Sequence, residues 1–155
     1  IDELLEFDKL NPNYDCIYIS FYKKYDKKIL DRLEEKEVLI WNPEEYTVND
    51  FILIIKDLCD VIISSRAHGV LLSTMAYIPT IAIEIEQKLK VVHEMMPLST
   101  KLVKGDSLHL LANTVELCLK YDDDYIKRVD KDLYKNSIEA KASIIKLEEW
   151  LRDVK

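Results

Sequence analysis

Glycine is scarce in this chain, which has only two among its 155 residues, Gly69 and Gly105. A dinucleotide-binding fold of the usual kind places several glycines in one loop, where they let the backbone approach a pyrophosphate. Gly69 stands alone in its segment, so the sequence excludes such a glycine-rich loop. Gly69 is nevertheless well placed, because it lies in the polar segment that follows a buried-type apolar run ending at Ile63.

Long apolar runs are also missing. No segment has the eighteen or so uncharged apolar residues that a membrane span needs. The longest candidates, "FILII" and "CDVII", are interrupted by Lys56, Asp57 and Asp60. The chain shows no secretory signal and starts at Ile1, so we expect a fragment of a longer chain that is cytoplasmic and has no membrane span.

Clustered cysteines and an excess of basic residues are absent as well. The three cysteines, Cys16, Cys59 and Cys118, form no C-x-x-C pair, which predicts reduced, packed thiols and no metal site. The net charge is −7 with 33% charged residues, which argues against a general affinity for nucleic acid or anionic membranes.

What the chain has in quantity is apolar surface, because 48% of its residues are hydrophobic. β-type runs alternate with helical patterns along the chain. We expect strands over 16–20, 38–41, 61–64, 80–85 and 101–103, and helices over 27–36, 47–59, 70–77, 88–96 and 107–121. Thr47 and Asp50 form a capping-box pattern at the start of the second helix. The order predicts an α/β fold, a single Rossmann-like domain over 1–155 whose parallel sheet of about five strands has helices on both faces.

The C-terminal part, about 122–155, has a different pattern. Apolar and small residues recur there at three- and four-residue steps, which predicts one or two amphipathic helices. They are Ile126, Val129, Leu133, Ser137, Ala140, Ile144, Leu147 and Leu151. We expect this helical extension to pack on the sheet or on a neighbouring domain. A short coiled coil is the alternative, with Ser137 and Ala140 as a thin seam.

Polar residues gather where the third predicted strand ends, in "DVIISSRAHG". Ligands of open α/β sheets bind beyond the carboxyl ends of the strands. A helix starts here, and its free N–H groups favour an anion, as does the forked guanidinium of Arg66. Ser64 and Ser65 can donate hydrogen bonds, Gly69 admits a close backbone approach, and His68 can transfer a proton near neutral pH.

A plainer interpretation of the same residues stays open. Ser65 can simply cap the helix, Arg66 can pair with a surface carboxylate, and His68 can have no special role. The residue types alone leave an anion site and this structural alternative equally supported.

The longer stretch "LCDVIISSRAHGVLLSTMAYIPTIAIEIEQKLK" resembles the signature region of the polysaccharide pyruvyl transferase family. That family's pattern has an Asp closing a helix, a strand, Ser-Arg-x-His, a helix, a strand opened by Pro, then an acidic residue and a Lys. The matching residues are Asp60, Ser65, Arg66, His68, Gly69, Pro79, Glu86 and Lys88. The resemblance is clear over about residues 47–93.

The resemblance implies a fold and a reaction. Such enzymes have two Rossmann-like domains, similar to GT-B glycosyltransferases. This chain resembles the C-terminal one, and we expect the N-terminal partner domain to be missing from it. They act in the biosynthesis of cell-envelope polysaccharides. They transfer the enolpyruvyl group of phosphoenolpyruvate to a sugar or glycan acceptor, which can be lipid- or nucleotide-linked, and release phosphate. No cofactor is implied beyond this donor substrate.

Residue roles follow from the resemblance in the same way. Arg66 holds the donor's carboxylate or phosphate with Ser64, Ser65 and Gly69, and His68 is the candidate general acid. Glu86 and Lys88 are expected near the site. The chain departs from the family at Ile85-Glu86, where a Tyr-Asp pair is frequent. We expect this departure to affect which acceptor is chosen more than how the donor is bound.

Three further points stay open. The segment "SFYKKYDKK" (20–28) can bring Ser20, Tyr22 or Lys23 to the same cleft or can be a solvated helix start. Glu84 can be a site carboxylate or a solvated strand end. The whole domain can instead be half of a GT-B glycosyltransferase or epimerase that binds a nucleotide-sugar, or a non-catalytic domain.

Overall fold

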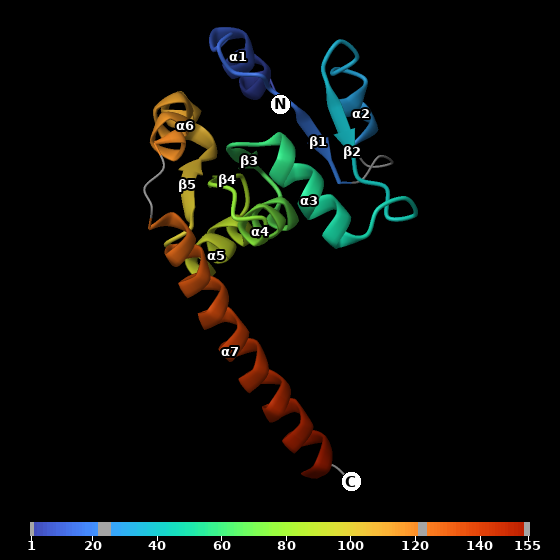
Figure 1. The fold of residues 1–155 in the computed structure, drawn as a ribbon, viewed down its shortest axis with the longest axis vertical. Coiled ribbons are helices and arrows are strands. Elements are labelled where there is room, and N and C mark those ends of the chain that lie inside the picture. The colour runs from blue at the N-terminus through green and yellow to red at the C-terminus, as the bar shows by residue number, and fades with distance from the viewer. Residues whose placement is uncertain (1, 22–25, 121–123, 154–155) are drawn as a thin grey trace.

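The computed structural model describes residues 2–21, 26–120 and 124–153, with side chains up to residue 146. Its five strands are parallel, as expected, but they form two sheets. β1 (Tyr18–Ser20) pairs with β2 (Val38–Ile40), and β3 (Ile62–Ser64), β4 (Thr80–Glu84) and β5 (Thr100–Lys104) form the second sheet in that order (Figure 1). The α/β class is confirmed, and the expectation of one five-stranded sheet is wrong.

Aromatic packing, and not hydrogen bonding between strands, attaches the two-stranded sheet of β1 and β2 to the rest of the domain. Phe21, directly after β1, packs edge-on against Phe51 with ring centroids 5.6 Å apart, and Trp41, after β2, stacks on Phe51 at 5.3 Å. Phe51 is fully buried in α3 (Val48–Leu58). These contacts hold β1 and β2 against a helix, and a cavity lies between β1 and β3.

Helices cover both faces of the three-stranded sheet, as predicted. On one face α3, α4 (Ala67–Met75) and α5 (Gln87–Met95) pack over Ile62 and Ala82. On the other, α1 (Asp2–Leu10) and α6 (Leu111–Leu119) pack over Ile81 and Ile63. Alternate residues of β3 and β4 thus face opposite cores, which explains why these strands are apolar throughout.

Local signals in the sequence decided some helix ends and not others. The capping box predicted for α3 is present, with Asp50 N donating to Thr47 Oγ1 at 3.2 Å and Thr47 N to Asp50 Oδ2 at 3.0 Å. The helix predicted over 27–36 is only α2 (Lys27–Leu30), followed by turns. The helix predicted over 107–121 begins as the 3-10 helix η1 (Gly105–Leu110), and α1 is additional to the predicted elements.

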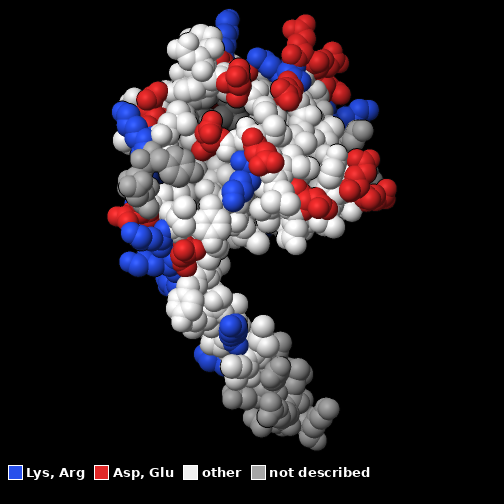
Figure 2. Space-filling view, in the orientation of Figure 1, with Lys and Arg blue, Asp and Glu red and all other residues white. Residues whose placement is uncertain are grey.

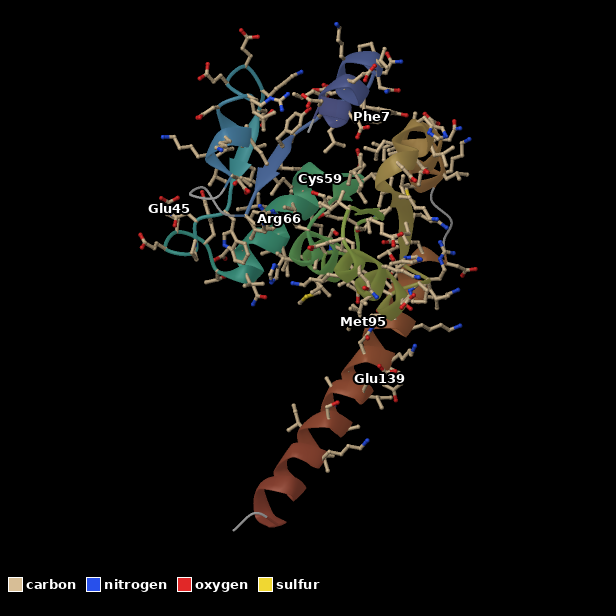
Figure 3. The ribbon with its side chains drawn as sticks, turned by 180° about the vertical axis from the view of Figure 1, so that it is seen from behind. Phe7, Glu45, Cys59, Arg66, Met95 and Glu139 are labelled. Atoms are coloured by element: carbon tan, nitrogen blue, oxygen red, sulfur yellow. The ribbon has the colours of Figure 1, made fainter. Side chains whose placement is uncertain are left out.

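The C-terminal extension is one long helix, α7 (Tyr125–Asp153). Its first turns are anchored, because the buried Asp132 carboxylate accepts hydrogen bonds from Leu98 N (3.0 Å), Ser99 N (2.9 Å) and Ser99 Oγ (2.8 Å). The helix then runs away from the body, with Ile138, Ile144 and Ile145 exposed. In Figure 3, Met95 marks the junction and Glu139 the projecting part. Packing on the body is therefore confined to the first turns.

None of the described helices, α7 included, is long and apolar enough to cross a membrane.

Candidate functional site

The loop between β3 and α4 forms an open helix N-terminus. Ser64 ends β3, and its hydroxyl donates to Arg66 O (2.9 Å) and accepts from Arg66 N (3.1 Å). Arg66 is the N-cap residue of α4, has an extended backbone, and makes no capping hydrogen bond with its side chain. The alternative in which Ser65 caps the helix is therefore wrong. The N–H groups of the first turn are left to a ligand or to solvent.

Arg66 does pair with a carboxylate, but that carboxylate is buried. Its Nη2 contacts Asp26 Oδ1, and Asp26 is only 6% exposed. Asp26 Oδ2 in turn accepts a hydrogen bond from Ser20 Oγ at 2.9 Å. Since Ser20 ends β1 and Arg66 follows β3, Asp26 connects the carboxyl ends of strands that belong to different sheets.

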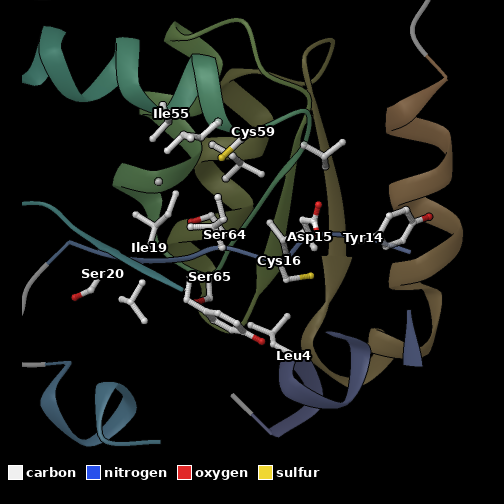
Figure 4. A pocket seen from close by; sticks show the side chains of 18 of the residues that line it. Leu4, Tyr14, Asp15, Cys16, Ile19, Ser20, Ile55, Cys59, Ser64 and Ser65 are labelled. Atoms are coloured by element: carbon white, nitrogen blue, oxygen red, sulfur yellow. The ribbon is translucent and has the colours of Figure 1, made fainter. Parts of the chain in front are cut away.

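A cavity of about 550 Å³ lies beside this connection, between the two sheets. One part is lined by polar residues from the ends of β1 and β3, namely Ser20, Asp26, Ser64, Ser65 and Arg66, together with Gly69. Figure 4 shows Ser20, Ser64 and Ser65 on this part, with Leu4 and Ile55 on the apolar remainder. Pockets of a few hundred Å³ that are mostly apolar and have a few polar groups are typical ligand sites.

Two thiols line the same cavity. Burial raises the pKa of Cys16 to about 11 and also raises the pKa of Cys59. Both thiols are therefore protonated and poorly nucleophilic near neutral pH. The other polar lining residues include hydroxyl groups, Arg66 and the carboxylates of Asp15, Asp26 and Asp60.

The remaining predicted residues lie outside the cavity. His68 is in the first turn of α4 and is exposed, so it is close to Arg66 in the chain but does not line the cavity. Glu86 is the N-cap residue of α5 and Lys88 lies in its first turn, both exposed. Glu84 ends β4 and is half-buried. The structure therefore brings Ser64, Ser65, Arg66 and Gly69 together and leaves Glu86 and Lys88 on the next helix.

Sequence reasoning missed Asp26. It lies in the 20–28 segment that was considered for the cleft, of which Ser20 does line the cavity, while Tyr22 and Lys23 lie outside the described residues. The only signal was a position shortly after a strand end, and nothing local indicates a partner forty residues further on. In the described ranges, no cluster of three or more potential metal ligands occurs. Figure 2 shows acidic and basic side chains interspersed over one face of the molecule, whose full chain has a net charge of −7.

The polysaccharide pyruvyl transferase family model matches residues 4–87, more than half of the chain. The chain belongs to the polysaccharide pyruvyl transferase family. The match runs from α1 to the start of α5 and includes Asp26 and the whole Ser64–Gly69 loop, whereas Lys88 lies just beyond it. It begins well before the stretch 47–93 whose resemblance was clear from the sequence. The chain matches none of the curated proteins and none of the solved structures with which it was compared.

Membership in this family makes the domain transferase-like. It also implies a sugar or glycan acceptor.

Proposed function

We propose that this domain takes the pyruvyl group of phosphoenolpyruvate and transfers it to a pair of hydroxyls on a sugar, within a glycan or its lipid- or nucleotide-linked precursor. One observation carries the proposal: Arg66 caps an open helix N-terminus at the edge of a cavity, inside the segment matched by the family. The donor is a compact polyanion, and this edge has a fixed cation with free backbone N–H groups beside it.

Arg66 binds the donor's carboxylate or phosphate. Its contact with Asp26 goes through Nη2, and half of its side-chain surface is exposed, so further N–H groups can reach a ligand. Ser65 lies beside it on the cavity, and the first-turn N–H groups of α4 add the positive end of the helix dipole. Gly69 and Ser64 shape the loop in which these donors converge.

His68 acts as the general acid. It protonates the methylene carbon of the donor, the neighbouring carbon becomes an oxocarbenium-like centre, and a sugar hydroxyl attacks that centre. The hydroxyl proton returns to the imidazole, the bond to the phosphate oxygen breaks, and the second hydroxyl closes the ketal as its proton leaves with the phosphate. Imidazole is the side chain that most often serves as a general acid in proton transfers of this kind. The exposure of His68 gives an acceptor access from the solvent side.

Glu86 and Lys88 act on the acceptor side. Both sit at the start of α5, which follows β4 at the same edge of the sheet as the Ser64–Gly69 loop. Their exposed charges can contact sugar hydroxyls. Because Ile85 replaces a frequent Tyr of the family, the acceptor contacts of this chain differ from those of its relatives. No metal or further cofactor is needed for the proposed reaction.

The compartment proposed is the cytoplasm. Cys16 and Cys59 are half-buried free thiols and Cys118 is a buried one, and free thiols are usual in reducing compartments.

Thermal denaturation with two alternative ligands tests the proposed donor. Phosphoenolpyruvate is expected to raise the melting temperature of the chain, since a ligand that binds only the folded state stabilises it. Stabilisation by a UDP-sugar and not by phosphoenolpyruvate would support the nucleotide-sugar alternative. No shift with either ligand would support a non-catalytic domain.

A further inference from the structure

We infer that Asp26 is a positioning residue, which holds the Arg66 guanidinium in the orientation that receives an anion. The inference rests on the proposed function for the identity of that anion. It assigns a role to a residue outside the Ser-Arg-x-His pattern, forty positions away from Arg66 in the sequence.

The contacts of Asp26 leave it little freedom. The residue is 6% exposed, Oδ2 accepts the Ser20 hydroxyl hydrogen bond at 2.9 Å, and Oδ1 accepts from Arg66 Nη2. The backbone carbonyl of Asp26 accepts from Ile29 N and Leu30 N, both at 2.8 Å, at the start of α2. Both the backbone and the side chain of Asp26 are therefore fixed before any ligand arrives.

Arg66 differs from Asp26 in this respect. Half of its side-chain surface is exposed, and it makes no capping bond to its own helix. An exposed arginine samples many rotamers, and ordering one on binding lowers affinity. The contact with Asp26 orders Arg66 in advance, so an anion meets a preoriented fork beside the first-turn N–H groups of α4.

The charge of Asp26 also has to be considered, because a carboxylate repels an anion. Asp26 lines the same cavity as Arg66, and its Oδ1 is in direct contact with the guanidinium while its Oδ2 accepts from the Ser20 hydroxyl. The contact neutralises Asp26 locally, whereas the exposed side of Arg66 keeps donors for a ligand. We therefore expect the preorientation of Arg66 to favour anion binding more than the charge of Asp26 opposes it. Loss of the Asp26 charge then weakens anion binding, whereas dominant repulsion would make binding tighter on the same change.

The test measures dissociation constants of phosphoenolpyruvate and of inorganic phosphate by calorimetry. Asp26→Asn keeps the volume of the buried side chain and removes its charge. It is expected to weaken binding of both anions by about three- to tenfold, the effect of leaving one long side chain unordered. Unchanged or tighter binding in this variant would overturn the inference, tighter binding showing that Asp26 competes with the anion for Arg66.

Two comparisons distinguish positioning from a general structural effect. Tyr14 lines another part of the same cavity and contacts Glu116. Tyr14→Phe removes this contact and is expected to leave both dissociation constants unchanged. In an Arg66→Lys background, Asp26→Asn is expected to change binding less than about twofold, because an ammonium is a point charge without a fork to orient. An equal loss in the lysine background would contradict positioning.

Other outcomes also decide the matter. If Asp26→Asn does not fold, Ser20→Ala is the substitute variant, because it removes the hydrogen bond to Asp26 Oδ2. It is expected to weaken anion binding as well, and unchanged affinity would count against the inference.

If the wild-type chain binds phosphate but not phosphoenolpyruvate, and Asp26→Asn weakens phosphate binding, the inference stands and the proposed donor fails. If it binds neither anion, both fail. If it binds phosphoenolpyruvate and Asp26→Asn binds it equally well, only the inference fails.

Discussion

Gly69 lies directly against Ser64 across the β3–α4 loop. A Cβ atom at Gly69 would stand 2.2 Å from Ser64 Oγ, 3.1 Å from Ser64 Cβ and 3.3 Å from Phe21 Cε2. The hydroxyl cannot turn aside without losing its two bonds to the Arg66 backbone. Gly69 is therefore needed for steric reasons, since only an absent side chain lets Ser64 shape the loop that presents Arg66.

Gly69→Ala is expected to destabilise the fold by about 1–3 kcal/mol, as overpacking of a tight site does. Ser64→Gly in the same chain removes the clashing atoms and is expected to restore part of that loss relative to Gly69→Ala. Urea denaturation of the two variants checks this. A Gly69→Ala chain as stable as the wild type would show that the loop can relax at no cost.

His68→Gln is expected to lower turnover by about 10²- to 10⁴-fold, the usual contribution of a general acid. The melting temperature should stay at the wild-type value because the ring is exposed. Release of phosphate from phosphoenolpyruvate in the presence of a glycan acceptor is the measurement. The matched control is His109→Gln, also exposed but in η1 outside the site, which is expected to keep full activity. Wild-type turnover in His68→Gln would remove the proton-transfer role.

A pH dependence of stability is expected from His93. Burial lowers the pKa of this ring. Its Nδ1 lies 2.7 Å from Thr100 Oγ1, and that hydroxyl donates to Met96 O at 2.7 Å, so Nδ1–H is the donor to Thr100. Glu84, Glu94, Lys101 and Asp132 are the charged groups that act on this ring.

The sign follows from linkage. The unfolded chain binds the proton near the ordinary pKa of about 6.5, and the folded chain only at lower pH, so stability is full above that pKa and falls as the pH drops below it. Urea midpoints between pH 7 and pH 5 are expected to fall less in His93→Gln than in the wild type. A slope identical in the two proteins would contradict the lowered pKa of His93.

Local patterns in the sequence predicted much of the fold. The capping box of Thr47 and Asp50 set the start of α3, and apolar runs marked all five strands. The helix over 27–36 was overestimated because its charged residues suit a helix, yet the chain turns after Leu30, and Leu33 is still buried. Local helix propensity does not determine where tertiary packing makes the chain turn.

The candidate site was predictable from the sequence only in part. Ser64, Ser65, Arg66 and Gly69 are contiguous, so the end of one strand and the start of one helix place them together. Asp26 reaches Arg66 only because two sheets meet at their carboxyl ends. Nor did the sequence indicate that aromatic packing on Phe51 would replace a ladder between β1 and β3.

The central claim, that phosphoenolpyruvate binds at Arg66, is tested most directly by a calorimetric titration of the wild-type chain and of Arg66→Ala with this compound. We predict a saturable heat of binding for the wild type that is absent in Arg66→Ala, because the variant lacks the cation at the N-terminus of α4. The same binding curve for both proteins, or no saturable heat with the wild type, would contradict the account.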